Sequence, residues 1–464
     1  MGVSVLRSVL LYSLSVGVVS AANFAATPLL LHLLGHDAFA QWSLIEPVLL
    51  ALVPVAGLGI QVNLLRKISR EAVADRSMVA GLLPFHLATS LVIGFIGGAI
   101  VIALGLPTLL ALLALTTLAV EGTLIFFVAL WRAEERPGRY ALIEGGRAVA
   151  LAAVLAIALC FVAAGSMTVD NYLAARLALA IVAALAALQI VRPDFRPASE
   201  AARQAIRYGL PIVVASMLGS ILTSVDRYAL GAGSADALAG YVAHTKVAQL
   251  LALASIAYFM WFGPKAMRKL DDGISAHRFF VVATTTLFLV ILALCANTWF
   301  IVPLVWPYFF PTVAFDRELF GILLAGTAML CLGNPLSLGA LREGKTYLAT
   351  LLSLAAVTMT LLACFALGGL FGPIGVAWGR MLGMATYSIL FAVSTIMALR
   401  IRYPFALYAL FAIGAALLVA SEEAMLPGHG VGTTALKIVT FNALALVAVV
   451  ACRGRLHLRT RNLA

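Results

Sequence analysis

Charged residues are scarce in this sequence of 464 residues: Asp, Glu, Lys and Arg together make up 11% of it. A soluble globular domain carries about 25% charged residues. Hydrophobic residues make up 63% of the chain, more than a soluble domain buries in its core. The composition therefore excludes an ordinary soluble enzyme or binding domain and predicts an integral membrane protein.

Cysteine is also rare, and its placement excludes the usual cysteine chemistry. The five cysteines form no C-x-x-C pair, and no histidine stands beside them at the spacing of a zinc ligand. We expect no metal, no cofactor and no catalytic residue. The cysteines lie in or at the end of apolar segments, where small packing residues are expected: Cys160, Cys295, Cys331, Cys364 and Cys452.

Acidic residues are fewer than basic ones, 20 against 31, and the formal net charge is +11. The basic residues do not gather on one helical face or in one long tail. They fall in small clusters between apolar segments, which is typical of membrane topology rather than of nucleic-acid binding. We therefore expect no nucleic-acid partner.

Long apolar segments follow one another through the chain. Each has about 19 to 27 residues, enough for a helix to cross a bilayer about 30 Å thick. The sequence predicts an all-α integral membrane protein of about fourteen transmembrane helices. The expected helices are 8–31, 39–64, 79–104, 107–130, 144–164, 170–191, 207–230, 238–263, 278–302, 317–340, 346–367, 372–397, 403–421 and 432–452.

The basic clusters predict the orientation of the chain. If the N-terminus is cytoplasmic, the basic clusters fall in the inner loops and in the C-terminal tail. Arg317 is then the one Lys or Arg residue in the predicted outer loops. Inner loops carry the excess of Lys and Arg in membrane proteins. We therefore expect both termini in the cytoplasm.

The two halves of the chain resemble each other at three points in the same order. Residues 37–42 match 236–241, 135–140 match 343–347, and 174–176 match 378–380, each at an offset of about 200 residues, which indicates one long repeat. Each half holds six helices that begin inside, so the repeat is parallel. This predicts three units: an N-terminal six-helix lobe 1–193, a C-terminal six-helix lobe 194–400, and a helix pair with a basic tail 401–464.

Particular motifs resemble a known family. The run LLGHDAFAQW at 33–42 resembles the opening of the polysaccharide-transporter family, which belongs to the multidrug/oligosaccharidyl-lipid/polysaccharide exporter superfamily. In the second half, YGLP at 208–211, SVDRYALG at 224–231 and GYVA at 240–243 are similar to that family's helices 7 and 8. The resemblance covers nearly the whole chain.

The resemblance implies a function. Such proteins move polyprenyl-pyrophosphate-linked oligosaccharides from the inner to the outer leaflet of a bacterial inner membrane, before assembly of O-antigen, capsule or exopolysaccharide. It implies a lipid-linked oligosaccharide and membrane lipids as partners, with the polysaccharide polymerase and chain-length machinery as further ones.

Charged side chains inside predicted spans are costly and mark functional candidates. Arg176 and Arg380 occupy equivalent places in the two halves, and the guanidinium group can bind phosphate oxygens in pairs. We expect both to contact substrate, with Lys246 and His244 as additions. A structural alternative stays open, in which the arginines pair with Glu46 or bind backbone carbonyls between helices.

Four further charged residues are candidates for coupling or gating. A buried carboxylate can carry a proton, so Glu46 and Glu121 are candidates for ion coupling, or else for structural hydrogen bonds. Asp226 and Arg227 stand next to each other one helical turn before Gly231. We expect them to have a structural or gating role.

Other functions remain as alternatives. A cation-coupled multidrug exporter of the same superfamily would place more negative than positive charge in its cavity, whereas bases slightly outnumber acids within the predicted spans. A peptidoglycan-precursor flippase is the nearest alternative in mechanism. A glycan polymerase or ligase needs a large outer loop, and every predicted outer loop is short, so we expect no enzyme.

Overall fold

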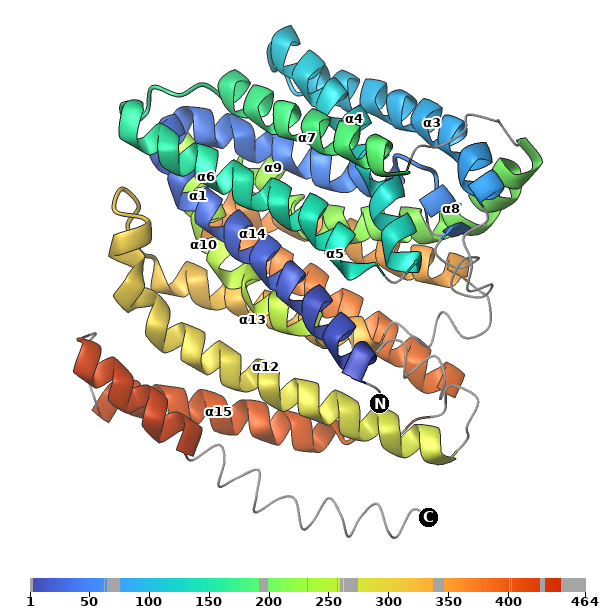
Figure 1. Cartoon of the computed structure of the whole chain (residues 1–464). Coiled ribbons are helices and arrows are strands. Elements are labelled where there is room, and N and C mark those ends of the chain that lie inside the picture. Colours follow the sequence, from blue (N-terminus) through green and yellow to red (C-terminus); the bar gives the residue numbers. More distant parts are fainter. Residues whose placement is uncertain are drawn as a thin grey trace.

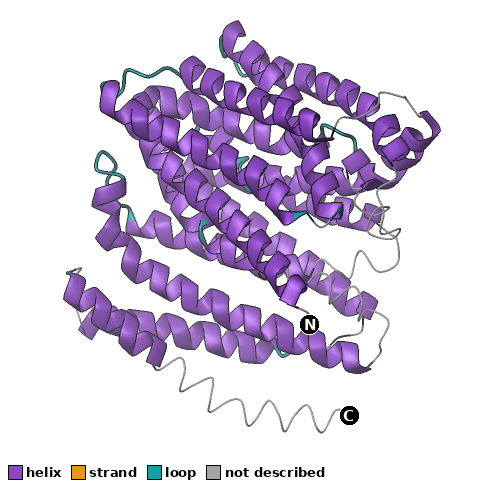
Figure 2. Cartoon of the chain, in the orientation of Figure 1, coloured by secondary structure: helices purple, strands orange, loops and turns teal. Residues whose placement is uncertain are grey.

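In the part of the chain that it describes, the computed structural model consists of helices with loops and turns between them and has no strand (Figure 2). This confirms the predicted all-α class. The described residues are 3–61, 63–64, 76–134, 136–191, 199–231, 233–256, 258, 262, 274–336, 346–399, 401, 403–425 and 430–443. Several predicted inner clusters, including those at 66–70 and 265–269, lie outside them.

The first half consists of one long kinked helix and several shorter ones (Figure 1). Its elements are α1 (Val3–Leu52), the 3-10 turn η1 (Val53–Val55), α3 (Arg76–Ala103), α4 (Thr108–Ala133), α5 (Pro137–Tyr140), the π-helical turn η2 (Ala141–Gly145), α6 (Gly146–Phe161) and α7 (Val169–Val191).

The second half repeats this use of long helices. Its elements are α8 (Ser199–Leu222), α9 (Asp226–Leu230), α10 (Ala235–Gln249), α12 (Ile274–Phe309), α13 (Arg317–Leu336), α14 (Thr346–Leu399), α15 (Phe405–Met425) and a final helix at 431–443.

Two glycines divide the longest helices. Gly35 has φ 71° and ψ 176° within α1, and Gly372 has φ 59° and ψ −140° within α14. A side chain is strained at such angles, so glycine is the residue that allows the chain to turn there. The predicted pairs 8–31 with 39–64 and 346–367 with 372–397 are therefore each joined through a sharp glycine turn.

The chain is a multi-pass membrane protein. Eight helices among the described residues are long and apolar enough to cross a bilayer, while the count of fourteen spans stays a prediction. Large apolar side chains such as Phe161 (85% exposed) and Leu370 (74%) point outward, as expected of helices whose outer faces contact lipid.

The helices pack both within and across the two halves of the sequence. In the first half α4 packs on α3 and α7, and in the second half α14 packs on α13 and α8, whereas α1 contacts both α6 and α10. We call α1 to α7 the N-terminal lobe and α8 to α14 the C-terminal lobe. The remaining pair lies along α12 (Figure 1): α15 packs on it, and Asn442 exchanges amide hydrogen bonds of 2.8 and 3.2 Å with Asn297.

The lobes meet at both ends of the second part of α1. At one end His36 forms an ion pair with Asp236 at the start of α10 and contacts Thr312. At the other end the backbone of Gly59 lies directly against Gly209 of α8, where a Cβ on either glycine would stand 2.2 Å from a backbone atom of the other. The absence of side chains at these two positions permits the close approach.

We predict that Gly209→Ala destabilises the protein by about 1–3 kcal/mol, because the added methyl group meets backbone that cannot rotate away. Gly219→Ala on the same helix is the matched control, since a Cβ there meets no atom within 4 Å. The control should gain about 0.5–1 kcal/mol from helix propensity. Thermal unfolding in detergent measures both, and equal melting temperatures for the two variants would contradict the contact.

Candidate functional site

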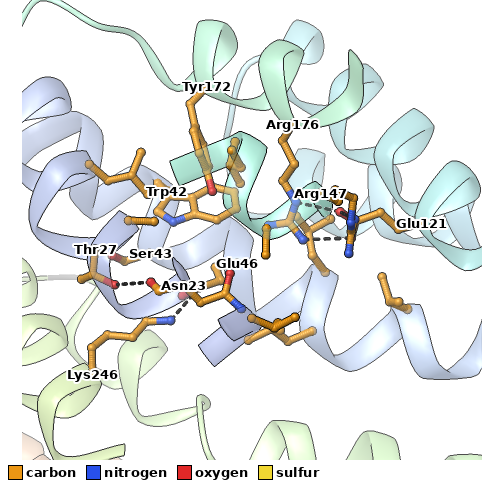
Figure 3. Close-up of a pocket in the computed structure, with 18 of the residues that line it drawn as sticks. Asn23, Thr27, Trp42, Ser43, Glu46, Glu121, Arg147, Tyr172, Arg176 and Lys246 are labelled. Atoms are coloured by element: carbon orange, nitrogen blue, oxygen red, sulfur yellow. Dashed lines mark hydrogen bonds and ion pairs between the residues drawn. The ribbon is translucent and has the colours of Figure 1, made fainter. Parts of the chain in front are cut away.

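A cavity of about 380 Å³ lies between α1, α4, α6, α7 and α10. Most of its wall belongs to the N-terminal lobe, and α10 contributes the part from the C-terminal lobe. Figure 3 shows the polar side chains that converge on it. The polar and charged lining residues are Asn23, Thr27, Trp42, Ser43, Glu46, Glu121, Glu144, Arg147, Tyr172, Arg176 and Lys246.

Helical spacing places these side chains on one wall. Residues three and four apart share a face of a helix, and both parts of α1 use this spacing, with Asn23 and Thr27 before the Gly35 turn and Trp42 and Glu46 after it. Because the chain turns at Gly35, the two helical parts of α1 each place one face on the same cavity. Tyr172 and Arg176 on α7 and Val242 and Lys246 on α10 follow the same rule.

Glu121 is the centre of the first charged cluster. Its carboxylate accepts two hydrogen bonds from Arg176, from Nε at 2.9 Å and from Nη2 at 2.8 Å, and one of 2.6 Å from Arg147. Only 4% of the Glu121 side chain is exposed. Glu144 adds a longer ion pair of 3.6 Å to Arg147. All of these residues belong to the N-terminal lobe, so this cluster braces α4, α6 and α7 (Figure 3).

Glu46 forms the second cluster, which joins the two lobes. One carboxylate oxygen accepts a hydrogen bond of 2.7 Å from Lys246, and the other accepts one of 2.7 Å from Arg227. Arg227 also donates to the Ser43 carbonyl at 3.3 Å. Glu46 lies on α1, whereas its two partners lie on α10 and α9. The cluster therefore crosses the boundary between the lobes beside the cavity.

A third cluster is buried inside the C-terminal lobe. Arg380 forms an ion pair of 2.5 Å with Asp226 and donates to the Thr223 carbonyl at 2.7 Å. Asp226 also accepts a hydrogen bond of 2.7 Å from Tyr241. The exposed fractions of Arg380 and Asp226 are 1% and 0%, so this pair is withdrawn from the cavity.

The structure thus places the predicted substrate residues differently from one another. Arg176 and Lys246 line the cavity, whereas Arg380 and His244 are not among the described lining residues. Nδ1 of His244 donates to the Gly240 carbonyl at 2.7 Å, and Nε2 accepts from the backbone N–H of Asp316 at 2.9 Å. Both ring nitrogens are therefore engaged, Nδ1 within α10 and Nε2 with the segment before α13. Substrate contact by Arg380 and His244 stays a prediction.

The expected symmetry between the two arginines fails at the level of their partners. Arg176 pairs with Glu121 and Arg380 with Asp226, so neither arginine pairs with Glu46. Arg380 also binds the Thr223 carbonyl, which is one of the structural roles that the sequence left open. Glu121 comes from the long helix α4, whereas Asp226 begins the short helix α9 and faces inward. The buried Asp226 keeps Arg380 inside the C-terminal lobe.

Seven of the polar lining residues were not predicted from the sequence: Asn23, Thr27, Trp42, Ser43, Glu144, Arg147 and Tyr172. The Trp42 ring packs edge-on against Tyr172 at 4.7 Å, and the Arg176 guanidinium lies 5.6 Å from the Trp42 ring centre. The spacing of Tyr172 and Arg176, four residues apart on one apolar helix, was an available signal.

The charges that line the cavity balance. The acidic residues are Glu46, Glu121 and Glu144, and the basic residues are Arg147, Arg176 and Lys246. The described residues contain no group of three or more metal-binding side chains. The arrangement is suited to reversible binding of a charged group, because each charge already has a partner that a ligand can replace.

Comparison with solved structures shows a transporter fold. A lipid II flippase, MurJ in an inward closed conformation, matches with a TM-score of 0.71 over 96% of this chain and 100% of its own, at 11% identity. An inward-facing multidrug resistance transporter of the MATE family, in the MOP superfamily, matches with 0.61 over 82% and 94%, at 17% identity. The Vibrio cholerae MATE transporter VcmN matches with 0.59 over 86% and 98%, also at 17%. At these identities the likeness concerns the fold alone.

No protein-family model matches the chain, and a search of curated proteins finds no match.

We predict that Asp226→Ala destabilises the protein by about 3–5 kcal/mol, because it leaves the buried Arg380 charge without its partner. Asp236→Ala is the matched control, since that carboxylate is 80% exposed in its ion pair with His36. An exposed pair contributes about 0–1 kcal/mol. Chemical or thermal unfolding of both variants gives the comparison, and a loss for Asp226→Ala no larger than the control's would argue against a buried charge pair.

Proposed function

We propose that this protein is a flippase that moves polyprenyl-pyrophosphate-linked oligosaccharides from the inner to the outer leaflet of a bacterial inner membrane. The translocated lipid-linked oligosaccharide would supply the assembly of O-antigen, capsule or exopolysaccharide. The observation that carries the proposal is the set of cationic side chains, Arg147, Arg176 and Lys246, that line a cavity within a membrane-spanning transporter fold. The sequence resemblance to polysaccharide transporters supports it.

The acidic head group is the part of this substrate that needs protein contacts. Hydrocarbon rejects a diphosphate, and fixed cations in a polar cavity lower that barrier. A guanidinium group can bind two phosphate oxygens, and Arg176 lines the cavity with its Nε and Nη2 bonded to Glu121. Lys246 supplies a point charge from the opposite lobe. Arg380 and His244 stay as proposed contacts in another conformation, in which the C-terminal lobe opens its interior.

Transport would proceed by alternating access. The lipid tail stays in the bilayer, and only the glycan and diphosphate enter the cavity as the lobes rock about it. Glu46, Asp226 and Arg227 are proposed gating residues. Glu46 and Arg227 form an ion pair between the lobes, and Asp226 stands next to Arg227 in the sequence. Glu121 is the proposed coupling residue next to Arg176.

The proposal includes the orientation of the protein in the membrane and its partners. The basic loops favour cytoplasmic termini, and the protein would act with a polysaccharide polymerase and chain-length machinery, catalysing no reaction itself. We expect no cofactor and no nucleic-acid partner.

Two other functions have a specific observation in their favour. Three carboxylates line the cavity, as a cation-coupled multidrug exporter would use them, and two of the matched structures are multidrug or MATE transporters. The match to a lipid II flippase over nearly all of both chains favours a peptidoglycan-precursor flippase. The wall holds as many basic as acidic side chains, so its charge alone does not favour an organic cation. The sequence resemblance to polysaccharide transporters favours the lipid-linked oligosaccharide.

The test is mass spectrometry of lipid extracts from a strain that lacks this gene, with surface polysaccharide measured in parallel. We expect lipid-linked oligosaccharide to accumulate and polymer to be lost, since the carrier lipid stays trapped in the inner leaflet. Wild type should restore polymer, whereas Arg176→Ala combined with Arg380→Ala, at equal abundance, should not.

Unchanged lipid-linked sugars and polymer, together with greater sensitivity to cationic drugs, would replace the proposal with multidrug export. Accumulation of the peptidoglycan precursor alone would replace it with the other flippase function.

A further inference from the structure

Every cation that lines the described cavity wall is already neutralised by a carboxylate of the same protein. Glu121 holds Arg147 and Arg176, and Glu46 holds Lys246. An anionic ligand that enters this cavity therefore has to displace a carboxylate before it can form a close ion pair. The identity of the carboxylate that yields decides where the acidic head group binds.

The two carboxylates are held with different strength. Glu121 is 4% exposed and accepts three hydrogen bonds from two arginines, two of them in a bidentate pair with Arg176. Glu46 is 15% exposed and accepts one bond from Lys246 and one from Arg227. Bidentate arginine pairs are the strong ones, and a buried carboxylate loses more when its partners leave. Of these two carboxylates, Glu46 is therefore the one that a ligand can replace at lower free-energy cost.

The geometry around Glu46 matches the needs of a phosphate group. Its two oxygens each face one cation at 2.7 Å, Lys246 on one side and Arg227 on the other. Two oxygens of a phosphate can accept the same two bonds. Lys246 is 21% exposed and lines the cavity, whereas Arg227 is 1% exposed behind it. A ligand in the cavity reaches the lysine first.

We propose that Glu46 is an internal competitor of the substrate: it occupies an anion site whose cations are Lys246 and Arg227, and the phosphate of the lipid head group takes Lys246 from it. This inference rests on the proposed function and adds the site at which the head group displaces a protein carboxylate. The ligand class is a lipid diphosphate or another organic phosphate.

The exchange has a consequence for the lobes. Glu46 belongs to the N-terminal lobe, and Lys246 and Arg227 belong to the C-terminal lobe. An ionic contact between the lobes therefore lies at the cavity, and a bound phosphate replaces part of that contact with one of its own. Entry and release of the head group in this way change what holds the lobes together, which is a requirement of coupled transport.

The test uses the purified full-length protein and farnesyl diphosphate as a soluble probe, titrated by isothermal calorimetry. Glu46→Gln keeps an oxygen that can accept from Arg227 but removes the competing charge. It should bind the probe about tenfold more tightly than wild type, equivalent to about 1.4 kcal/mol. A gain in affinity is not a result that misfolding produces.

The matched control is Glu144→Gln, which removes the same charge from the same cavity wall without touching the contact between lobes. General attraction is screened within about 8–10 Å at physiological salt, so the control should gain about twofold or less. Farnesol, with the same tail and no phosphate, should bind all variants equally.

A double-mutant cycle separates displacement at Lys246 from a general charge effect. In a Lys246→Met background, Glu46→Gln should gain no more than the Glu144→Gln control, because the cation that Glu46 withholds from the ligand is gone.

Equal gains for Glu46→Gln and Glu144→Gln, or a full gain in the Lys246→Met background, would overturn the inference and leave the proposed function in place. Failure of wild type and all variants to bind farnesyl diphosphate, with binding of an organic cation instead, would overturn both.

Discussion

The structure depends on one constraint, that a charge inside a membrane protein needs a partner of opposite sign. Three carboxylates meet it at three places: Glu121 within the N-terminal lobe, Asp226 within the C-terminal lobe, and Glu46 between them. Since an unpaired ion in hydrocarbon is costly, each cluster fixes the helices that carry it. The first two clusters brace the lobes internally. The third is the one that can change when the lobes move, because its members belong to different lobes.

The same constraint shapes the cavity. Its wall carries cations, as binding of an acidic head group requires, but carboxylates of the same wall balance their charge, so the cavity holds no uncompensated positive charge within the membrane. A substrate anion then exchanges with an existing partner. This keeps binding reversible, which a transporter needs as much as affinity, since a head group that meets free cations in a dry site is slow to leave.

Much of the fold was predictable from the sequence, because apolar length and glycine position act locally. The all-α membrane class is confirmed, and the breaks near Gly35 and Gly372 fall between helices that were predicted as separate. The site was predictable in part: Arg176 and Lys246 line the cavity. The withdrawal of Arg380 was not predictable, because the internal repeat shows equivalent positions but not partners. The burial of Asp226 at a helix start, and the approach of Arg147 to Glu121 from another helix, depend on tertiary packing.

Native mass spectrometry of the protein purified from its own membranes measures whether the cavity lined by Arg176 holds a polyprenyl-diphosphate oligosaccharide. Wild type should carry this glycolipid, and Arg176→Ala, purified in the same way, should not. A wild-type protein that carries only ordinary phospholipid, or an Arg176→Ala protein that retains the glycolipid at equal occupancy, would contradict the proposed function.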